Sequence, residues 1–137
     1  GLGAWSGSCW LATLHSMQKT SELIWQDAQH QVLFEILDDI RKPDSGTAVI
    51  QRLLEYTQTH FTLEERYMEL VNFPGREVHI RAHDHFRDEI KKLLMHDQQY
   101  DALFMGVIST YLTEWLKRHV LGIDKDLEAF ILASSVK

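Results

Sequence analysis

The 137-residue chain has few of the residues that interrupt helices and no apolar run long enough to cross a membrane. Only two prolines and seven glycines occur, several of them clustered, so long uninterrupted helices are possible. The single cysteine, Cys9, cannot form an internal disulfide, and we interpret it as an ordinary small apolar residue. No apolar stretch approaches the roughly 20 residues of a membrane-spanning helix, and no signal peptide is evident. We therefore expect a cytoplasmic protein without membrane insertion.

Basic residues are outnumbered by acidic ones: the chain has 14 Lys and Arg and 20 Asp and Glu residues, which gives a net charge of −6. Proteins that bind nucleic acid need a basic face, so we expect no nucleic-acid partner. Hydrophobic residues make up 45% of the chain, which favours one packed domain over a disordered chain. The chain is unusually rich in histidine, with eight residues. They are scattered along the sequence and so do not form a tag, and this number favours a role such as metal binding.

The hydrophobic periodicity predicts four long helices, at about residues 27–41, 47–71, 76–95 and 100–120. Segments rich in helix breakers, such as 42–46 and 72–75, separate them. Short connections favour antiparallel neighbours, which predicts an all-α protein built as an up-down-up-down four-helix bundle. Residues 1–24 lack clear periodicity and are expected to form an N-terminal arm, with the bundle in residues 25–137. A short C-terminal helix is expected at 124–133.

Every predicted long helix carries a histidine on its apolar face, counted at about 100° per residue. These histidines are His30, His60, His79, His83 and His119. Glu64 lies one turn after His60, and His79 and His83 are also one turn apart, so each pair places two donors about 6 Å apart. Asp124 follows His119 by five residues, which is not helical spacing. Gly122 between them would allow the chain to bend so that both side chains turn inward.

Such a set of buried donors favours a metal centre. One histidine on an apolar face is ordinary, because it usually finds a hydrogen-bond partner. Five histidines with a carboxylate would cost several kcal/mol to bury unless another group compensates. A metal ion compensates, since neutral imidazole and carboxylate are preferred donors. By contrast, His85 and His96 fall on the opposite face of the third helix and His15 lies in the arm, so we assign these three no role.

The pattern resembles the hemerythrins, and specifically the bacterial ones. The matching segments are 27–34 (DAQHQVLF), 60–68 (HFTLEERYM), 79–86 (HIRAHDHF), 115–120 (WLKRHV) and the pair Asp124-Lys125. The resemblance covers about residues 26–131, and the segments in this order and spacing are far more specific than any one alone. The family usually has an aliphatic residue where Gln26 stands, and the adjacent Trp25 is not expected.

The resemblance implies a non-haem diiron protein that binds dioxygen reversibly as an oxygen carrier or store, and not an enzyme. His79, His83 and His119 would hold one iron, whereas His30 and His60 would hold the other. Glu64 and Asp124 would bridge both irons, together with an oxo or hydroxo group. The second iron would keep an open position for dioxygen. The aromatic residues that would exclude water from this pocket, or equally form plain core, are Phe34, Phe61, Phe86 and Trp115.

Three competing interpretations stay open at this point. Ferritin-like diiron oxidases have carboxylate-rich sites with Glu-x-x-His pairs, whereas His60 and Glu64 form a His-x-x-x-Glu pair, which disfavours oxidase chemistry. The same centre would also suit an oxygen- or redox-sensing module of a larger signalling protein with an output domain, and the start at Gly1 rather than Met fits an excised module. A metal-free interaction bundle is disfavoured by the buried donors.

Overall fold

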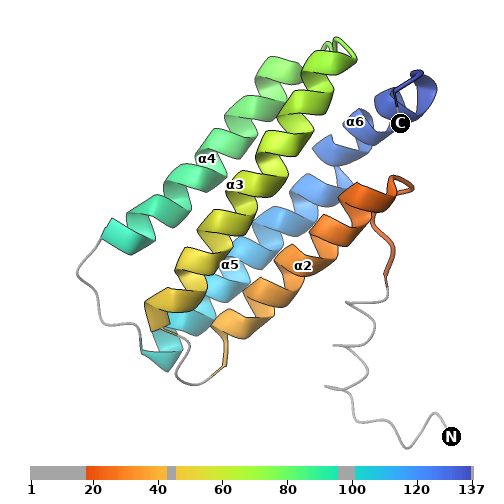
Figure 1. The fold of residues 1–137 in the computed structure, drawn as a ribbon. Coiled ribbons are helices and arrows are strands. Elements are labelled where there is room, and N and C mark those ends of the chain that lie inside the picture. The colour runs from red at the N-terminus through yellow and green to blue at the C-terminus, as the bar shows by residue number, and fades with distance from the viewer. Residues whose placement is uncertain (1–17, 43–45, 96–100, 137) are drawn as a thin grey trace, which may run out of the picture.

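The computed structural model describes residues 18–42, 46–95 and 101–136, and every regular element among them is a helix (Figure 1). The helices are α2 (Ile24–Ile40), α3 (Gly46–Leu70), α4 (Arg76–Met95), α5 (Ala102–Leu121) and α6 (Ile123–Ala133). The four long helices α2 to α5 alternate in direction along the chain, and α6 continues beyond the end of α5 (Figure 1). The predicted all-α, up-down-up-down bundle with a short C-terminal helix is confirmed.

The four long helices close around a common interior. α2 packs against α3 and α5, and α3 packs against α4. α4 and α5 meet through the rings of Phe86 and Trp115, whose centroids are 4.3 Å apart. α6 packs against α5. Each helix therefore turns one face toward a shared core, as the period of its apolar residues predicts.

The apolar core is divided into two clusters with a polar layer between them. Leu23, directly before α2, belongs to the smaller cluster, and along α2 the larger cluster begins at Leu33. Along α3 the order is reversed, with Phe61 in the larger cluster and Met68 in the smaller one. On α2 His30 lies between the two clusters, and on α3 Glu64 lies between Phe61 and Met68. Burial of a large apolar side chain contributes about 1.5–3 kcal/mol, so the two clusters can offset the cost of a buried polar layer.

The first helix begins earlier than the sequence suggests. α2 starts at Ile24, three residues before Asp27. Leu23 provides no side-chain cap, and Ile24 is 87% exposed, so neither residue carries a recognisable start signal. Asp27 lies in the first turn instead, where its carboxylate accepts hydrogen bonds from the backbone N–H and the hydroxyl of Thr20. A residue type common at helix starts thus serves to tie the preceding segment to α2.

The fourth helix starts at Ala102, two residues later than predicted, because Asp101 caps it. The Asp101 side chain accepts a hydrogen bond of 2.8 Å from the backbone N–H of Phe104. His85 is exposed on α4, as predicted. The interpretations of Cys9, His15 and His96, and most of the predicted arm, fall outside the described residues. Among the described helices, none combines the length and the apolar character that a membrane span requires.

Candidate metal centre

All seven predicted ligands meet inside the bundle, and each is at most 5% exposed. They come from every described helix: His30 from α2, His60 and Glu64 from α3, His79 and His83 from α4, His119 from α5, and Asp124 from α6. Their donor atoms form two groups, within each of which all atoms lie within 4.8 Å of one another. The three-histidine half contains His79, His83 and His119, the two-histidine half contains His30 and His60, and Glu64 and Asp124 belong to both.

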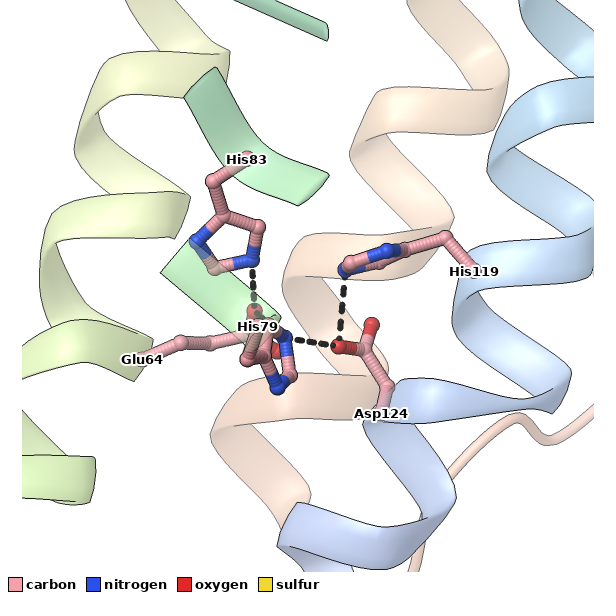
Figure 2. Close-up of side chains that lie close together, drawn as sticks. All are labelled: Glu64, His79, His83, His119 and Asp124. Carbon is pink, nitrogen blue, oxygen red and sulfur yellow. Dashed lines mark ion pairs between the residues drawn. The ribbon is translucent and has the colours of Figure 1, made fainter. Parts of the chain in front are cut away.

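The three-histidine half is drawn in Figure 2. Nε2 of His83 lies 3.0 Å from Oε1 of Glu64. Nε2 of His79 and Nε2 of His119 lie 2.9 and 3.0 Å from Oδ1 of Asp124. The imidazoles from α4 and α5 therefore point at one oxygen of each carboxylate.

The two-histidine half uses the other oxygen of each carboxylate. Nε2 of His30 lies 3.0 Å from Oδ2 of Asp124 and 3.8 Å from Oε2 of Glu64. Nε2 of His60 lies 3.4 Å from the same Oε2. Glu64 and Asp124 thus each turn one oxygen toward each half. This is the arrangement in which a carboxylate can bridge two cations.

The donor set fits a pair of cations. Nε2 of all five histidines has no hydrogen-bond partner among the described residues, and neither have Oε1 of Glu64 and both carboxylate oxygens of Asp124. Buried polar atoms without partners cost stability, so their convergence requires a compensating charge. Imidazole nitrogen suits iron, zinc, copper and nickel, and carboxylate oxygen completes such sites. The residues present can therefore hold two transition-metal ions.

Outer hydrogen bonds fix the two imidazoles of the two-histidine half. Nδ1 of His60 lies 2.7 Å from Oε1 of Gln29, and because an amide oxygen only accepts, the imidazole donates. Nδ1 of His30 lies 2.9 Å from the hydroxyl of Thr20, which donates in turn to Asp27. These contacts leave Nε2 of each ring facing the cluster, as metal-binding histidines need.

A charged partner fixes His83 in the three-histidine half. Its Nδ1 donates to Oε2 of Glu65 at 2.7 Å. Arg87 lies 2.9 Å from the same oxygen and 5.2 Å above the ring of Phe61. The carboxylate of Glu65 makes the imidazole a stronger electron donor than a neutral acceptor would. Neither Glu65 nor Gln29 was predicted from the sequence, because each lies directly beside a predicted ligand and so off the helical repeat of the apolar face.

Opposite charges perturb the ionisation of the cluster. Burial alone would lower the pKa of His30, but Asp124 and Glu64 outweigh it and raise the pKa to about 9. The same causes raise the pKa of His79 to about 9. Burial lowers the pKa of His119. Burial opposes ionisation of Glu64, yet the neighbouring histidines hold its pKa well below its ordinary value. Without metal, protons on His30 and His79 take the place of cations.

Gly122 gives the bend that brings Asp124 into the cluster. It lies between the end of α5 and the start of α6, with φ −113° and ψ −92°. A Cβ atom at this position would lie 2.7 Å from the backbone oxygen of Arg118, which is closer than a side chain can approach. Only glycine therefore fits this bend. It allows His119 and Asp124, whose spacing is not helical, to face the same point.

Phe61 is the predicted pocket residue that touches both halves. Its ring stacks on His83 with centroids 3.7 Å apart and planes at 6°. It also lies 5.8 Å from the ring of His60. Phe61 is fully buried, so it shields one side of both imidazoles from water.

The other predicted aromatic residues lie elsewhere around the cluster. Trp115 stacks on His119 with centroids 4.8 Å apart and planes at 13°, and Phe86 stacks on Trp115 in turn. Both therefore flank the three-histidine half. Phe34 is buried within the larger apolar cluster.

Gln26, which stands where the family usually has an aliphatic residue, is a polar neighbour of the cluster that was not among the predicted site residues. Its side chain is fully buried, and its Nε2 donates to Oε2 of Glu64 at 2.8 Å. The spacing of Gln26 could have predicted this place, because Gln26 precedes His30 by one helical turn and lies on the same face of α2.

The fold and the site define a helical-bundle protein with a buried His/Glu/Asp cluster that can hold metal cations. Residues 24–131 match the family described as Hemerythrin HHE cation binding domain, and the chain belongs to the hemerythrin family. It is 31% identical over 98 residues to a myohemerythrin of Riftia pachyptila, which covers 72% of this chain and 76% of that protein. It is 26% identical over 119 residues to a bacteriohemerythrin of Stenotrophomonas maltophilia, covering 75% and 77%. The comparison with solved structures gives no match.

Proposed function

We propose that this domain is a non-haem diiron protein that binds dioxygen reversibly and serves as an oxygen carrier or store. The observation that carries this proposal is the division of one buried cluster into halves with three and two histidines that share both carboxylates. Relatives named myohemerythrin and bacteriohemerythrin support it. When bound, two iron ions joined by an oxo or hydroxo group would supply the electrons and the binding position for dioxygen.

The residues of the chain prepare unequal places for the two irons. His79, His83 and His119 with the two carboxylates offer five donors to one cation, whereas His30 and His60 with the same carboxylates offer four to the other. A cation with fewer protein donors keeps a position that a small ligand can enter without displacing a side chain. We therefore infer that dioxygen enters at the two-histidine half.

The surroundings favour binding over chemical turnover. The histidines and carboxylates are at most 5% exposed, so bulk water has little access to the cluster. In this scheme all five histidines and both carboxylates serve as donors to the cations. None of these seven is left to transfer protons to a substrate as a general acid or base, and for this reason we propose no enzymatic activity.

Iron analysis combined with visible spectra tests the proposal. Purified protein should contain about two irons per chain, as the two donor groups require. Its visible bands should disappear on anaerobic reduction and a distinct set should appear when air is readmitted, then disappear again under vacuum. One zinc per chain, or no metal after careful purification, would contradict the proposal.

The position of the ligand is a separate prediction. Azide and dioxygen should bind only at the iron held by His30 and His60, because that iron has one protein donor fewer. A crystal structure of the azide adduct checks this directly. An azide on the iron of His79, His83 and His119 would refute the assignment while leaving the diiron centre intact.

A sensing role is the second candidate function, and one observation favours it. Asp124 is both a shared donor of the cluster and the second residue of α6. A change in the oxidation state or ligation of the irons would therefore act directly on the start of the C-terminal helix. In that case the partner would be an output domain of a longer signalling protein.

A further inference from the structure

Gln26 makes a direct contact with the cluster through a defined atom. It lies on α2 one turn before His30, is 0% exposed, and donates from Nε2 to Oε2 of Glu64 at 2.8 Å. Glu64 is also 0% exposed. A carboxylate only accepts hydrogen bonds, so the amide must turn its NH₂ group toward it. The contact is therefore an oriented hydrogen bond between two buried groups.

The amide is costly to keep at this position. Oε1 of Gln26 is buried and has no hydrogen-bond partner among the described residues. An unpaired buried amide oxygen costs stability, and an apolar side chain of similar length would fill the position without that cost. Packing alone therefore does not explain a glutamine here. A residue that breaks a rule of core composition beside a ligand cluster indicates a role in function.

The hydrogen bond acts on one oxygen of the shared carboxylate. Oε2 of Glu64 is the oxygen that faces His60 at 3.4 Å and His30 at 3.8 Å. Donation from the amide fixes the direction of the carboxylate and withdraws electron density from this oxygen. Oε2 then gives less electron density to a cation in the two-histidine half. Such a cation binds anionic ligands more strongly and resists oxidation.

We propose that Gln26 is a positioning residue that holds Oε2 of Glu64 and strengthens the binding of small anionic ligands at the two-histidine half. The inference rests on the proposed diiron function and deepens it. It gives the two halves a second asymmetry, because the amide acts on the half that already has fewer protein donors.

Gln26→Met tests this role, since methionine keeps the length and flexibility of glutamine but cannot donate. The variant should retain two irons, bind azide to the diferric protein on the order of fivefold more weakly, and autoxidise faster than the wild type. Gln51→Met on α3 is the control. Gln51 is exposed and its amide donates to Glu55, away from the cluster, so this variant should bind azide as the wild type does.

The outcomes separate this inference from the proposed function. A Gln26→Met protein with two irons and wild-type azide affinity overturns the role of Gln26 and leaves the diiron proposal standing. A wild-type protein without iron overturns both. If the variant does not retain iron, calorimetric titration of the metal-free protein with Zn²⁺ decides. A change in the affinity of one of the two binding events supports the positioning role, whereas an equal effect on both, or on neither, refutes it.

Discussion

Glu64 and Asp124 organise the centre at the scale of single residues. Each carboxylate turns one oxygen toward the three-histidine half and the other toward the two-histidine half. Every histidine contributes to one half, so removing one imidazole affects one cation first. Removing either carboxylate affects both. Substitutions at the two kinds of position should therefore differ in how much metal the protein loses.

His60→Ala and Glu64→Ala should lower the iron content, and Glu64→Ala should lower it more, because Glu64 serves both halves. Metal binding is coupled to folding, and removing one member of a buried charged set costs about 3 kcal/mol or more, so both variants should also unfold more readily. Iron analysis and denaturant titration measure the two effects. His85→Ala is the control, since His85 is exposed on α4 and should keep both irons. Equal iron loss in His85→Ala would show that the placement of His85 on the solvent face of α4 is wrong.

Metal affinity should rise with pH. In the metal-free protein the pKa values of His30 and His79 are raised from 6.5 to about 9, so both rings carry protons below that pH. A cation must displace these protons, and the affinity for Zn²⁺ should therefore increase from pH 6.5 to about 9 and then level off. Calorimetry in buffers of different ionisation enthalpy counts the released protons. An affinity that does not change over this range would contradict the raised pKa values.

The same ionisation sets how the metal-free fold responds to pH. A raised pKa means that the folded state holds the proton more tightly than the unfolded state does. The stabilisation by protonated His30 and His79 beside the carboxylates is then fully present below pH 6.5 and is lost as the pH rises through about 9. Metal-free protein should be less stable at alkaline than at neutral pH, whereas iron-loaded protein should not follow this trend.

At the scale of elements, α6 connects the cluster to the C-terminal part of the domain. Asp124 lies in its first turn, and Leu127 and Ile131 on the same helix pack in the smaller apolar cluster. A shift of Asp124 would therefore move a rigid, packed helix rather than a loop. Gly122 lies directly before this helix at the bend.

If the domain is a sensor, hydrogen exchange of α6 should change between the diferrous and diferric states. The reason is that Asp124 shares its oxygens with both halves and leads directly into the helix. The backbone amides of α2 between Leu33 and Ile40 serve as an internal reference, because the buried side chains of this segment pack in the larger apolar cluster. Equal protection of α6 in both states would count against sensing and favour a carrier or store.

The sequence predicted the elements that have a clear apolar period and a breaker at each end. The range 76–95 agrees with α4, because a turn at 72–75 precedes it and its histidines repeat at one helical turn. The first helix was less well bounded, since its start at Ile24 has no side-chain cap and Asp27 bonds to Thr20 instead. Boundaries that depend on such tertiary contacts leave no trace in the local pattern.

The ligands of the site could be predicted from the sequence, whereas the residues that hydrogen-bond to those ligands could not. The seven predicted ligands could be proposed because six lie on apolar helix faces and the resemblance supplied their roles. Glu65 and Gln29, which hold the outer nitrogens of His83 and His60, depend on how neighbouring helices meet. Gln26 had the right spacing but no chemistry of a metal ligand, so only its contact with Glu64 revealed its place.

At the scale of the whole molecule, the cluster joins every described helix. Its donors come from α2, α3, α4, α5 and α6, and they lie between two apolar clusters. Two bound cations would therefore act as a cross-link among all five helices, and their charge would compensate donor atoms that have no hydrogen-bond partner in the described part of the chain.

Removing the metal should lower the stability of the entire bundle and not of one helix. Free cation at a thousand times its Kd would stabilise the fold by about 4 kcal/mol, so chelation should reverse a change of at least that order. Circular dichroism during heating, with and without chelator, measures the shift in Tm. A metal-free protein with an unchanged Tm would show that the apolar clusters alone hold the fold.

The stacking of Trp115 on His119 should couple tryptophan fluorescence to metal binding. The indole lies face to face with an imidazole that the proposed function assigns to iron, with ring centroids 4.8 Å apart. An excited indole at this distance would pass its energy to the coloured centre before it emits. The fluorescence of Trp115 would be quenched in the metal-loaded protein and would recover after chelation. Trp115 fluorescence would therefore report how much metal is bound, without an attached dye.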